Sequence, residues 1–296
     1  MTTRPTTTPT LEDALASFLR GLTGANKSRA TITAYRTDIA QFLAFLHETN
    51  CTVTTPADVT RLDVAEHLNV LAAQGRSGIT RARKLASLRE YFRYLEEHEL
   101  VPENPTLGVE TPKKERSGRT ALRADEYTKL LSLAGESPRD YAIFQVFLQT
   151  GVRVSELCAL TLEDIDFTSR TITIGQGKGQ KERTIELEKK GIRAIKSYLD
   201  VRPTSLHREL FLNYQGEPLS ERGVRKMVAK YLAASGLTKK ISPHSLRHTF
   251  ATYKAERGVS PYVLREWLGH ARLDTTQIYV HLARGSSKKV MEATSL

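Results

Sequence analysis

Three prolines and a charged stretch divide the chain shortly after its first hundred residues. Pro102, Pro105 and Pro112 interrupt a helical pattern, and TPKKERSGRT at residues 111–120 contains no large apolar side chain. Proline lacks a backbone N–H and restricts the residue before it, so a helix seldom runs through such a cluster. We therefore predict a linker at 111–120 between two domains, since 296 residues suffice for two.

The linker divides the rest of the sequence into three segments. These are a Thr-rich lead-in at 1–10, which we expect to be disordered, a first domain at 11–110 and a second domain at 121–296. Apolar residues of the first domain recur at helical spacing, and Thr60 with Asp63 matches a capping box. We predict a small bundle of four or five helices there.

The second domain is predicted to be mainly helical with one small antiparallel sheet. Helices are expected near 124–134 and 138–150, the latter ended by Gly151. TITIG at 171–175 and ERTIELE at 182–188 are typical of strands, and the QGKGQK between them predicts a β-hairpin. A later helix ends at a glycine, and we expect its apolar residues to lie in the core: Tyr262, Val263, Trp267 and Leu268.

Positive charge is concentrated in the second domain. The chain has a net charge of +11, and residues 121–296 hold 28 Lys and Arg against 19 Asp and Glu, whereas residues 1–120 hold 16 against 14. Each Lys or Arg placed against a phosphate releases bound counterions, so this balance favours a polyanionic partner.

Several classes of protein are excluded by what the sequence lacks. Cys51 and Cys158 are far apart and form no CxxC pair, which argues against a disulfide framework and a cysteine-built zinc site. The sequence has no apolar run of the roughly 18 residues that a membrane span needs and no apolar core near its start. We expect a soluble cytoplasmic protein without membrane contact.

Basic side chains occur on the predicted helix 78–98 and beside the hairpin. Arg81, Arg83 and Lys84 are candidates for contact with a DNA backbone, and Lys181 and Arg183 are candidates for simple backbone binding. The structural alternative is a solvated helix face, which is the more common explanation for any single arginine.

Six residues together indicate a phosphate-centred site. Arg153, with Glu156 to orient it, can clamp two phosphate oxygens, and Arg247 can donate to one anion together with His244, three residues before it on the same helix face. The full set is Arg153, Lys178, His244, Arg247, His270 and Tyr279. Each has an ordinary structural alternative: a helix cap, a turn, a solvated arginine or a packed tyrosine. Cationic donors stabilise a phosphodiester under attack, and a tyrosyl oxygen forms a covalent intermediate whose reversal needs no ATP.

A metal site built on His244, His270 and His281 is one alternative to this interpretation. No HExxH motif or carboxylate cluster accompanies these histidines, so we expect no metal and no other cofactor. GQGKGQK also lacks the Ser or Thr that follows the lysine of a phosphate-binding loop, so nucleotide hydrolysis is not supported.

Four blocks of sequence resemble the tyrosine recombinase (phage integrase) family, and within it the Xer-like recombinases. They occur in the family's order and at similar spacing: TGVRVSEL, GKGQKER, HSLRHTFAT and LGHARLDTTQIYVHL. The resemblance covers nearly the whole chain and implies a SAM-like, core-binding helical domain followed by a catalytic domain. Glu186 replaces a proline of many relatives, a departure that should leave catalysis undisturbed.

The resemblance also implies roles for the candidate residues. Arg153, Arg247, His244 and His270 would bind the scissile phosphate, and Glu156 would support them. Lys178 would be the general acid for the 5′ oxygen, and Tyr279 would form the 3′-phosphotyrosyl bond.

The implied partners are double-stranded DNA with paired recombination sites and three further subunits. The enzyme would exchange strands through a Holliday junction as a homotetramer, or as a heterotetramer with a sister recombinase, and an activating protein is a further candidate partner. The tail 283–296 resembles a segment that such enzymes pass to a neighbouring subunit. Chromosome-dimer resolution and mobile-element integration or excision fit the sequence equally.

Three alternative functions are also compatible with the sequence. They are a non-catalytic DNA-binding architectural or regulatory protein, a type IB topoisomerase and a metal-dependent phosphodiesterase. Tyr279 and Lys178 have no use in a binding protein, the helical first domain argues against a topoisomerase, and the missing carboxylate cluster argues against the phosphodiesterase.

Overall fold

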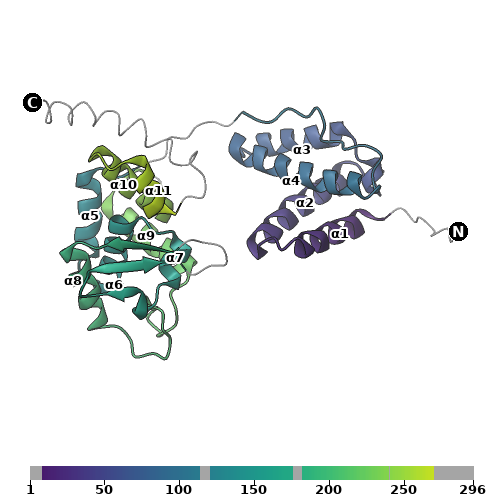
Figure 1. The fold of residues 1–296 in the computed structure, drawn as a ribbon. Coiled ribbons are helices and arrows are strands. Elements are labelled where there is room, and N and C mark those ends of the chain that lie inside the picture. The colour runs from purple at the N-terminus through teal and green to yellow at the C-terminus, as the bar shows by residue number, and fades with distance from the viewer. Residues whose placement is uncertain (1–8, 114–120, 176–181, 240, 270–296) are drawn as a thin grey trace, which may run out of the picture. The chain divides into compact units, whose positions relative to one another are not determined.

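The computed structural model describes residues 9–113, 121–175, 182–239 and 241–269 (Figure 1). Contacts between Cα atoms divide the chain into an N-terminal unit, Met1–Ser117, and a C-terminal unit, Gly118–Leu296. The division falls inside the stretch that we predicted as the linker.

The N-terminal unit is a bundle of helices (Figure 1). Within residues 9–113 its α-helices are α1 (Leu11–Gly24), α2 (Arg29–Thr49), α3 (Arg61–Ala73) and α4 (Gly78–Glu97), with the 3-10 helix η1 (Pro56–Asp58) before α3. The predicted capping box is confirmed, because Thr60 Oγ1 accepts from the Asp63 backbone and the Asp63 carboxylate accepts from the Thr60 N–H. Such reciprocal bonds satisfy donors that a helix start leaves open.

Aromatic side chains fill the core of this bundle. Phe18, Phe42 and Phe92 are almost fully buried, and Phe18 meets Tyr91 edge-on with ring centroids 5.4 Å apart. His67 lies beside Phe42, with centroids 5.3 Å apart, and neither of its ring nitrogens has a hydrogen-bond partner among the described residues.

A buried carboxylate ties α2 to α4. Asp38 accepts hydrogen bonds from Arg83, from Lys84 Nζ at 2.9 Å and from Ser87 Oγ at 2.8 Å. Lys84 is only 6% exposed and also bonds Gln41. The structure therefore differs from the expectation that Lys84 faces outward: its ammonium is held by Asp38, where the free energy of ion pairing compensates for lost hydration.

The C-terminal unit is mainly helical with one small sheet. Its described helices are α5 (Ala124–Ala134), α6 (Pro138–Thr150), α7 (Val154–Ala159), η2 (Leu162–Asp164), α8 (Lys189–Leu199), α9 (Glu221–Ser235), α10 (Pro243–Glu256) and α11 (Pro261–Leu268). A mainly α chain of two domains with one antiparallel sheet is thereby confirmed.

The sheet contains three antiparallel strands in the order β1-β2-β3. They are β1 (Ile165–Asp166), β2 (Thr171–Ile174) and β3 (Arg183–Glu186), and Ile172 pairs with both Ile165 and Ile185. Ile172 and Ile185 are buried, and both lie on the face of the sheet that packs against the core. We did not predict β1, because two residues are too few to show any periodicity.

The prediction for α11 was wrong at two positions. Leu268 is buried and Trp267 packs partly against the core, but Tyr262 is 69% and Val263 37% exposed. An eight-residue helix buries one stripe, here Leu264, Trp267 and Leu268, and positions 262 and 263 fall outside it.

Candidate active site

The turn between α6 and α7 presents Arg153. Gly151 ends α6 in the left-handed conformation with φ of 62°, and a Cβ there would lie 2.4 Å from Phe250 Cδ1. Only glycine fits both the backbone angle and the space. Two residues later Arg153 is the N-cap of α7, and its side chain stays 36% exposed.

Glu156 orients Arg153 through two hydrogen bonds. The Glu156 carboxylate accepts from the Arg153 backbone N–H at 2.7 Å and from Arg153 Nη1 at 2.6 Å. The i to i+3 spacing in the sequence predicted this pairing, and the structure brings the two side chains together.

Arg183, the first residue of β3, occupies the other side of the same carboxylate. Its Nη2 lies 2.7 Å from Glu156 Oε2 and its Nη1 3.2 Å from Oε1, while its Nε donates to the Trp267 carbonyl at 2.6 Å. The Arg183 side chain is 5% exposed. It therefore differs from the surface cation that we expected: it is a buried residue that joins β3 to α7 and α11.

The charge of Glu156 is fixed by these contacts. Burial alone would raise its pKa, but the hydrogen bonds from Arg183 and Arg153 outweigh burial and lower the pKa to about 2. Glu156 is consequently ionised at any pH at which the protein would work, and it holds both guanidinium groups by charge-assisted bonds.

Arg247 approaches the same turn from α10. Ser242 caps this helix and Pro243 begins it, as predicted. Arg247 is 4% exposed; its Nη1 donates to the Gly151 carbonyl at 2.7 Å and its Nη2 to the Leu268 carbonyl. His244 lies one turn earlier on α10 and is exposed.

Three arginines meet at the C-terminal end of α11. The carbonyls of Trp267, Leu268 and Gly269 accept from Arg183, Arg247 and Arg153 respectively, the last at 3.0 Å. Helix ends leave carbonyls without intrahelical partners and carry partial negative charge, which guanidinium groups satisfy. The structure thus brings together Arg153, Glu156 and Arg247 at the residue that precedes His270.

Four predicted site residues lie outside the described residues. They are Lys178, Lys181, His270 and Tyr279. Among the described residues, no group of His, Cys, Asp and Glu could hold a metal ion. Within the part of the chain that the structure describes, a search for membrane-spanning helices finds no candidate.

The structure also qualifies the candidate DNA contacts. Arg83 bonds Asp38 but keeps a side chain 53% exposed, whereas Arg81 has a buried Nε that lacks a partner within the described part of the chain.

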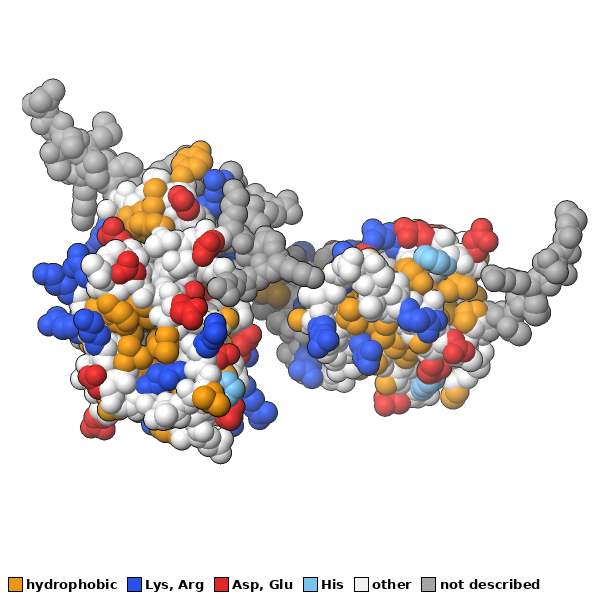
Figure 2. All heavy atoms as spheres, turned by 60° about the horizontal axis from the view of Figure 1, so that its bottom comes forward, with side chains coloured by type: hydrophobic (Ala, Val, Ile, Leu, Met, Phe, Trp, Pro, Cys, Tyr) orange, Lys and Arg blue, Asp and Glu red, His pale blue; other side chains and the backbone are white. Residues whose placement is uncertain are grey.

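A basic face of α9 was not predicted from the sequence. Arg222 and Lys226, one turn apart, are exposed, and α9 packs against α7 and α10. Their i to i+4 spacing was a readable signal. Acidic side chains accompany the basic ones on the face shown in Figure 2, so charge alone does not identify an interface.

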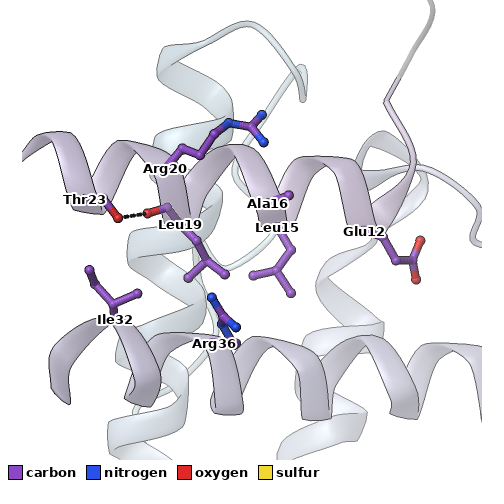
Figure 3. A pocket seen from close by; sticks show the side chains of 8 residues that line it. All are labelled: Glu12, Leu15, Ala16, Leu19, Arg20, Thr23, Ile32 and Arg36. Carbon is purple, nitrogen blue, oxygen red and sulfur yellow. Dashed lines mark hydrogen bonds between the residues drawn. The ribbon is translucent and has the colours of Figure 1, made fainter. Parts of the chain in front are cut away.

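A hollow of about 500 Å³ between α1 and α2 is not a catalytic site. Leu15, Leu19 and Ile32 line it together with Arg20 and Arg36 (Figure 3). None of the predicted site residues takes part, and its polar groups do not converge on a common point as a phosphate site requires.

Two models of known families match most of this chain. The model of the phage integrase family matches residues 120–285, and that of the phage integrase N-terminal SAM-like domain matches residues 15–99. A tyrosine recombinase XerC from Halalkalibacterium halodurans is 36% identical over 278 residues, covering 90% of this chain and 91% of the relative.

Two further proteins are similar over most of their length. A tyrosine recombinase XerD from Listeria innocua is 35% identical over 292 residues, covering 95% of this chain and 97% of the relative. The crystal structure of a lambda integrase tetramer bound to a Holliday junction has a TM-score of 0.75 at 22% identity, over 89% of this chain and 78% of that one.

These matches define an enzyme that breaks and rejoins DNA strands. The chain belongs to the phage integrase family, the tyrosine recombinases.

Proposed function

We propose that this tyrosine recombinase cuts DNA with Tyr279 at a phosphate held by Arg153 and Arg247. The observation that supports this most strongly is the convergence of both arginines on the α6–α7 turn and on the end of α11. Tyr279 follows α11 by eleven residues, close enough in sequence for the chain to return to that point.

Cleavage replaces one phosphate ester by another. The Tyr279 phenol loses its proton to solvent as its oxygen attacks the scissile phosphorus; a bond forms between them, and the bond from phosphorus to the 5′ oxygen breaks. Lys178 gives its proton to that leaving oxygen. In the rejoining step a 5′ hydroxyl attacks the phosphotyrosine and the phenol leaves, so no ATP and no metal is required.

The cations stabilise the charge that develops on the non-bridging oxygens. Arg153 and Arg247 donate directly, with His244 and His270 as further donors, and Glu156 keeps Arg153 aimed. Donors fixed in advance by Glu156 and by backbone carbonyls avoid reorganisation at the moment of reaction.

The proposed partner is double-stranded DNA bearing two recombination sites. Because lambda integrase forms a tetramer on a Holliday junction, we propose the same assembly here, from one kind of subunit or with a sister recombinase, and with or without an activating protein. Arg81, Arg83 and Lys181 remain proposed backbone contacts, and we add Arg222 and Lys226. The task would be chromosome-dimer resolution or mobile-element integration or excision, in the cytoplasm.

Covalent trapping tests the proposal. The protein is incubated with nicked duplexes in chelator, and adducts are resolved on a denaturing gel beside Tyr279→Phe. We expect an adduct that disappears in the variant. An adduct that persists in Tyr279→Phe would exclude this nucleophile, and DNA binding without any adduct across a randomised pool would point to a binding protein.

A further inference from the structure

Arg183 joins three segments that carry the proposed site. Its guanidinium group bonds both carboxylate oxygens of Glu156, and its Nε bonds the Trp267 carbonyl. The side chain is 5% exposed, too little for a direct contact with DNA. Arg183 also lies five residues after Lys178, at the base of the predicted hairpin.

We propose that Arg183 is a positioning residue, which holds Arg153 and the end of α11 in the geometry that phosphate binding requires. This inference rests on the proposed function and deepens it. Arg183 acts through Glu156 and through the backbone of α11, without touching the DNA.

The first step of the argument concerns Glu156. A carboxylate has about four acceptor positions. All four are used: the Arg153 backbone N–H and Nη1 take two, and Nη1 and Nη2 of Arg183 take two. Removing Arg183 would leave Glu156 with two of its four hydrogen bonds, so its carboxylate could rotate. Arg153 would then no longer be held in its present orientation.

The second step concerns the end of α11. Arg183 packs directly against Gly269, where an added Cβ would lie 3.1 Å from Arg183 Nη1. The neighbouring carbonyls of Leu268 and Gly269 are bonded by Arg247 and Arg153. A shift of α11 caused by loss of Arg183 would therefore displace acceptors of both phosphate-binding arginines.

Arg202 offers a matched control in the same unit. It donates to the carbonyls of His207, Glu209 and Leu210 at 2.8–3.2 Å, so it also anchors a loop by several hydrogen bonds. None of these acceptors belongs to α7, β3 or α11. Arg202→Gln should cost stability without altering the site.

The first experiment measures strand cleavage. Nicked duplexes that trap the parent protein are selected from a randomised pool, and single-turnover adduct formation is measured at saturating DNA between pH 5 and 9. We expect Arg183→Gln to slow it at least about tenfold with a DNA Kd within about threefold of the parent, as for lost preorganised donors. Its rate should fall at a higher pH on acidification than that of the parent, because Glu156 loses the partner that keeps it ionised. Arg183→Lys should recover part of the rate.

The second experiment uses the free protein. Carbon-13 NMR of the Glu156 carboxyl should show its pKa, about 2 in the parent, rising in Arg183→Gln and unchanged in Arg202→Gln. Equal cleavage rates and pH profiles in Arg183→Gln and the parent would overturn the proposal. So would an equal loss in Arg202→Gln at the same folded fraction. A parent that forms no adduct at all would overturn the proposed function instead, and the titration would then decide separately whether Arg183 controls Glu156.

Discussion

Each unit contains a buried carboxylate bonded by two cationic side chains, and the two clusters differ in what surrounds them. Asp38 receives all its side-chain partners, Arg83, Lys84 and Ser87, from the single helix α4. Glu156 receives its partners from the start of α7 and from β3. These partners, Arg153 and Arg183, also donate hydrogen bonds to carbonyls at the end of α11. The first cluster fastens two helices, whereas the second gathers the ends of several segments around a partly exposed arginine.

The comparison shows how a site can be separated from a structural ion pair. In both clusters burial alone would raise the carboxyl pKa and hydrogen bonds lower it, so a perturbed pKa does not distinguish them. The distinguishing feature is that the cations of the Glu156 cluster lie at turns and at the ends of helices and strands, where the backbone can present them to a ligand.

The largest expected effect is on stability, in the Asp38 cluster. Asp38→Ala removes the partner of buried Lys84 and should destabilise the N-terminal unit by about 3–5 kcal/mol, the usual cost of an unpaired buried charge. Urea unfolding followed by a dye on exposed Cys51 measures it. The double variant Asp38→Leu with Lys84→Met should recover most of the loss; if it does not, the ion pair itself is what stabilises the bundle.

The next effect is on chemistry, in the Glu156 cluster. Arg153→Gln should slow adduct formation at saturating DNA about 10²–10³-fold, as loss of one preorganised donor does. Ser87→Ala, which removes a buried hydrogen-bond partner of Asp38, is the control and should leave that rate near the parent value. Similar losses in both variants would remove the distinction between the two clusters.

Acid should weaken the two units in different pH ranges. Burial, and then the positive charge of Lys84, lower the pKa of His67 to about 4, while Asp38 opposes the shift. In the unfolded chain His67 therefore binds a proton below about pH 6.5, whereas in the folded unit it binds one only below about pH 4. This difference lowers the free energy of unfolding by about 3 kcal/mol as the pH falls through that range. Glu156, with its lowered pKa, contributes stability that is lost only below about pH 4.5.

Between pH 6.5 and 4.5 we therefore expect the N-terminal unit to weaken first. The dye on Cys51 reports that unit, and fluorescence of the single tryptophan, Trp267, reports the C-terminal unit. His67→Leu should remove the acid sensitivity of the first signal and leave the second as it was. Simultaneous loss of both signals in the parent and the variant would contradict the assignment to His67.

The smallest effect concerns DNA affinity. Lys226→Gln should lower the slope of log affinity against log salt by about 0.9, the contribution of one phosphate contact. The Asp38→Leu, Lys84→Met pair should leave the slope unchanged, since the Lys84 ammonium is already bonded within the core. If the slope changes in the Asp38→Leu, Lys84→Met variant and not in Lys226→Gln, the DNA contact lies in the Asp38 cluster, and the assignment of that cluster to structure alone is wrong.

The sequence by itself determined the local structure and the family. Caps at Thr60 and Ser242, the glycine that ends α6, and the alternation in β2 all depend on residues within a few positions of one another. The four sequence blocks that indicate the family likewise need no three-dimensional information, and the match to the family model confirms that the chain belongs to it. The roles of Tyr279, His270 and Lys178 stay predictions.

Only the tertiary structure decided which basic side chains are buried. Lys84 and Arg183 look like surface cations in the sequence, but Asp38 lies 46 positions from the first and Glu156 27 positions from the second. Burial of a charge depends on whether a distant segment supplies its counter-ion and excludes water there. Such a counter-ion is brought close by packing between helices and strands, so sequence periodicity and composition do not predict it.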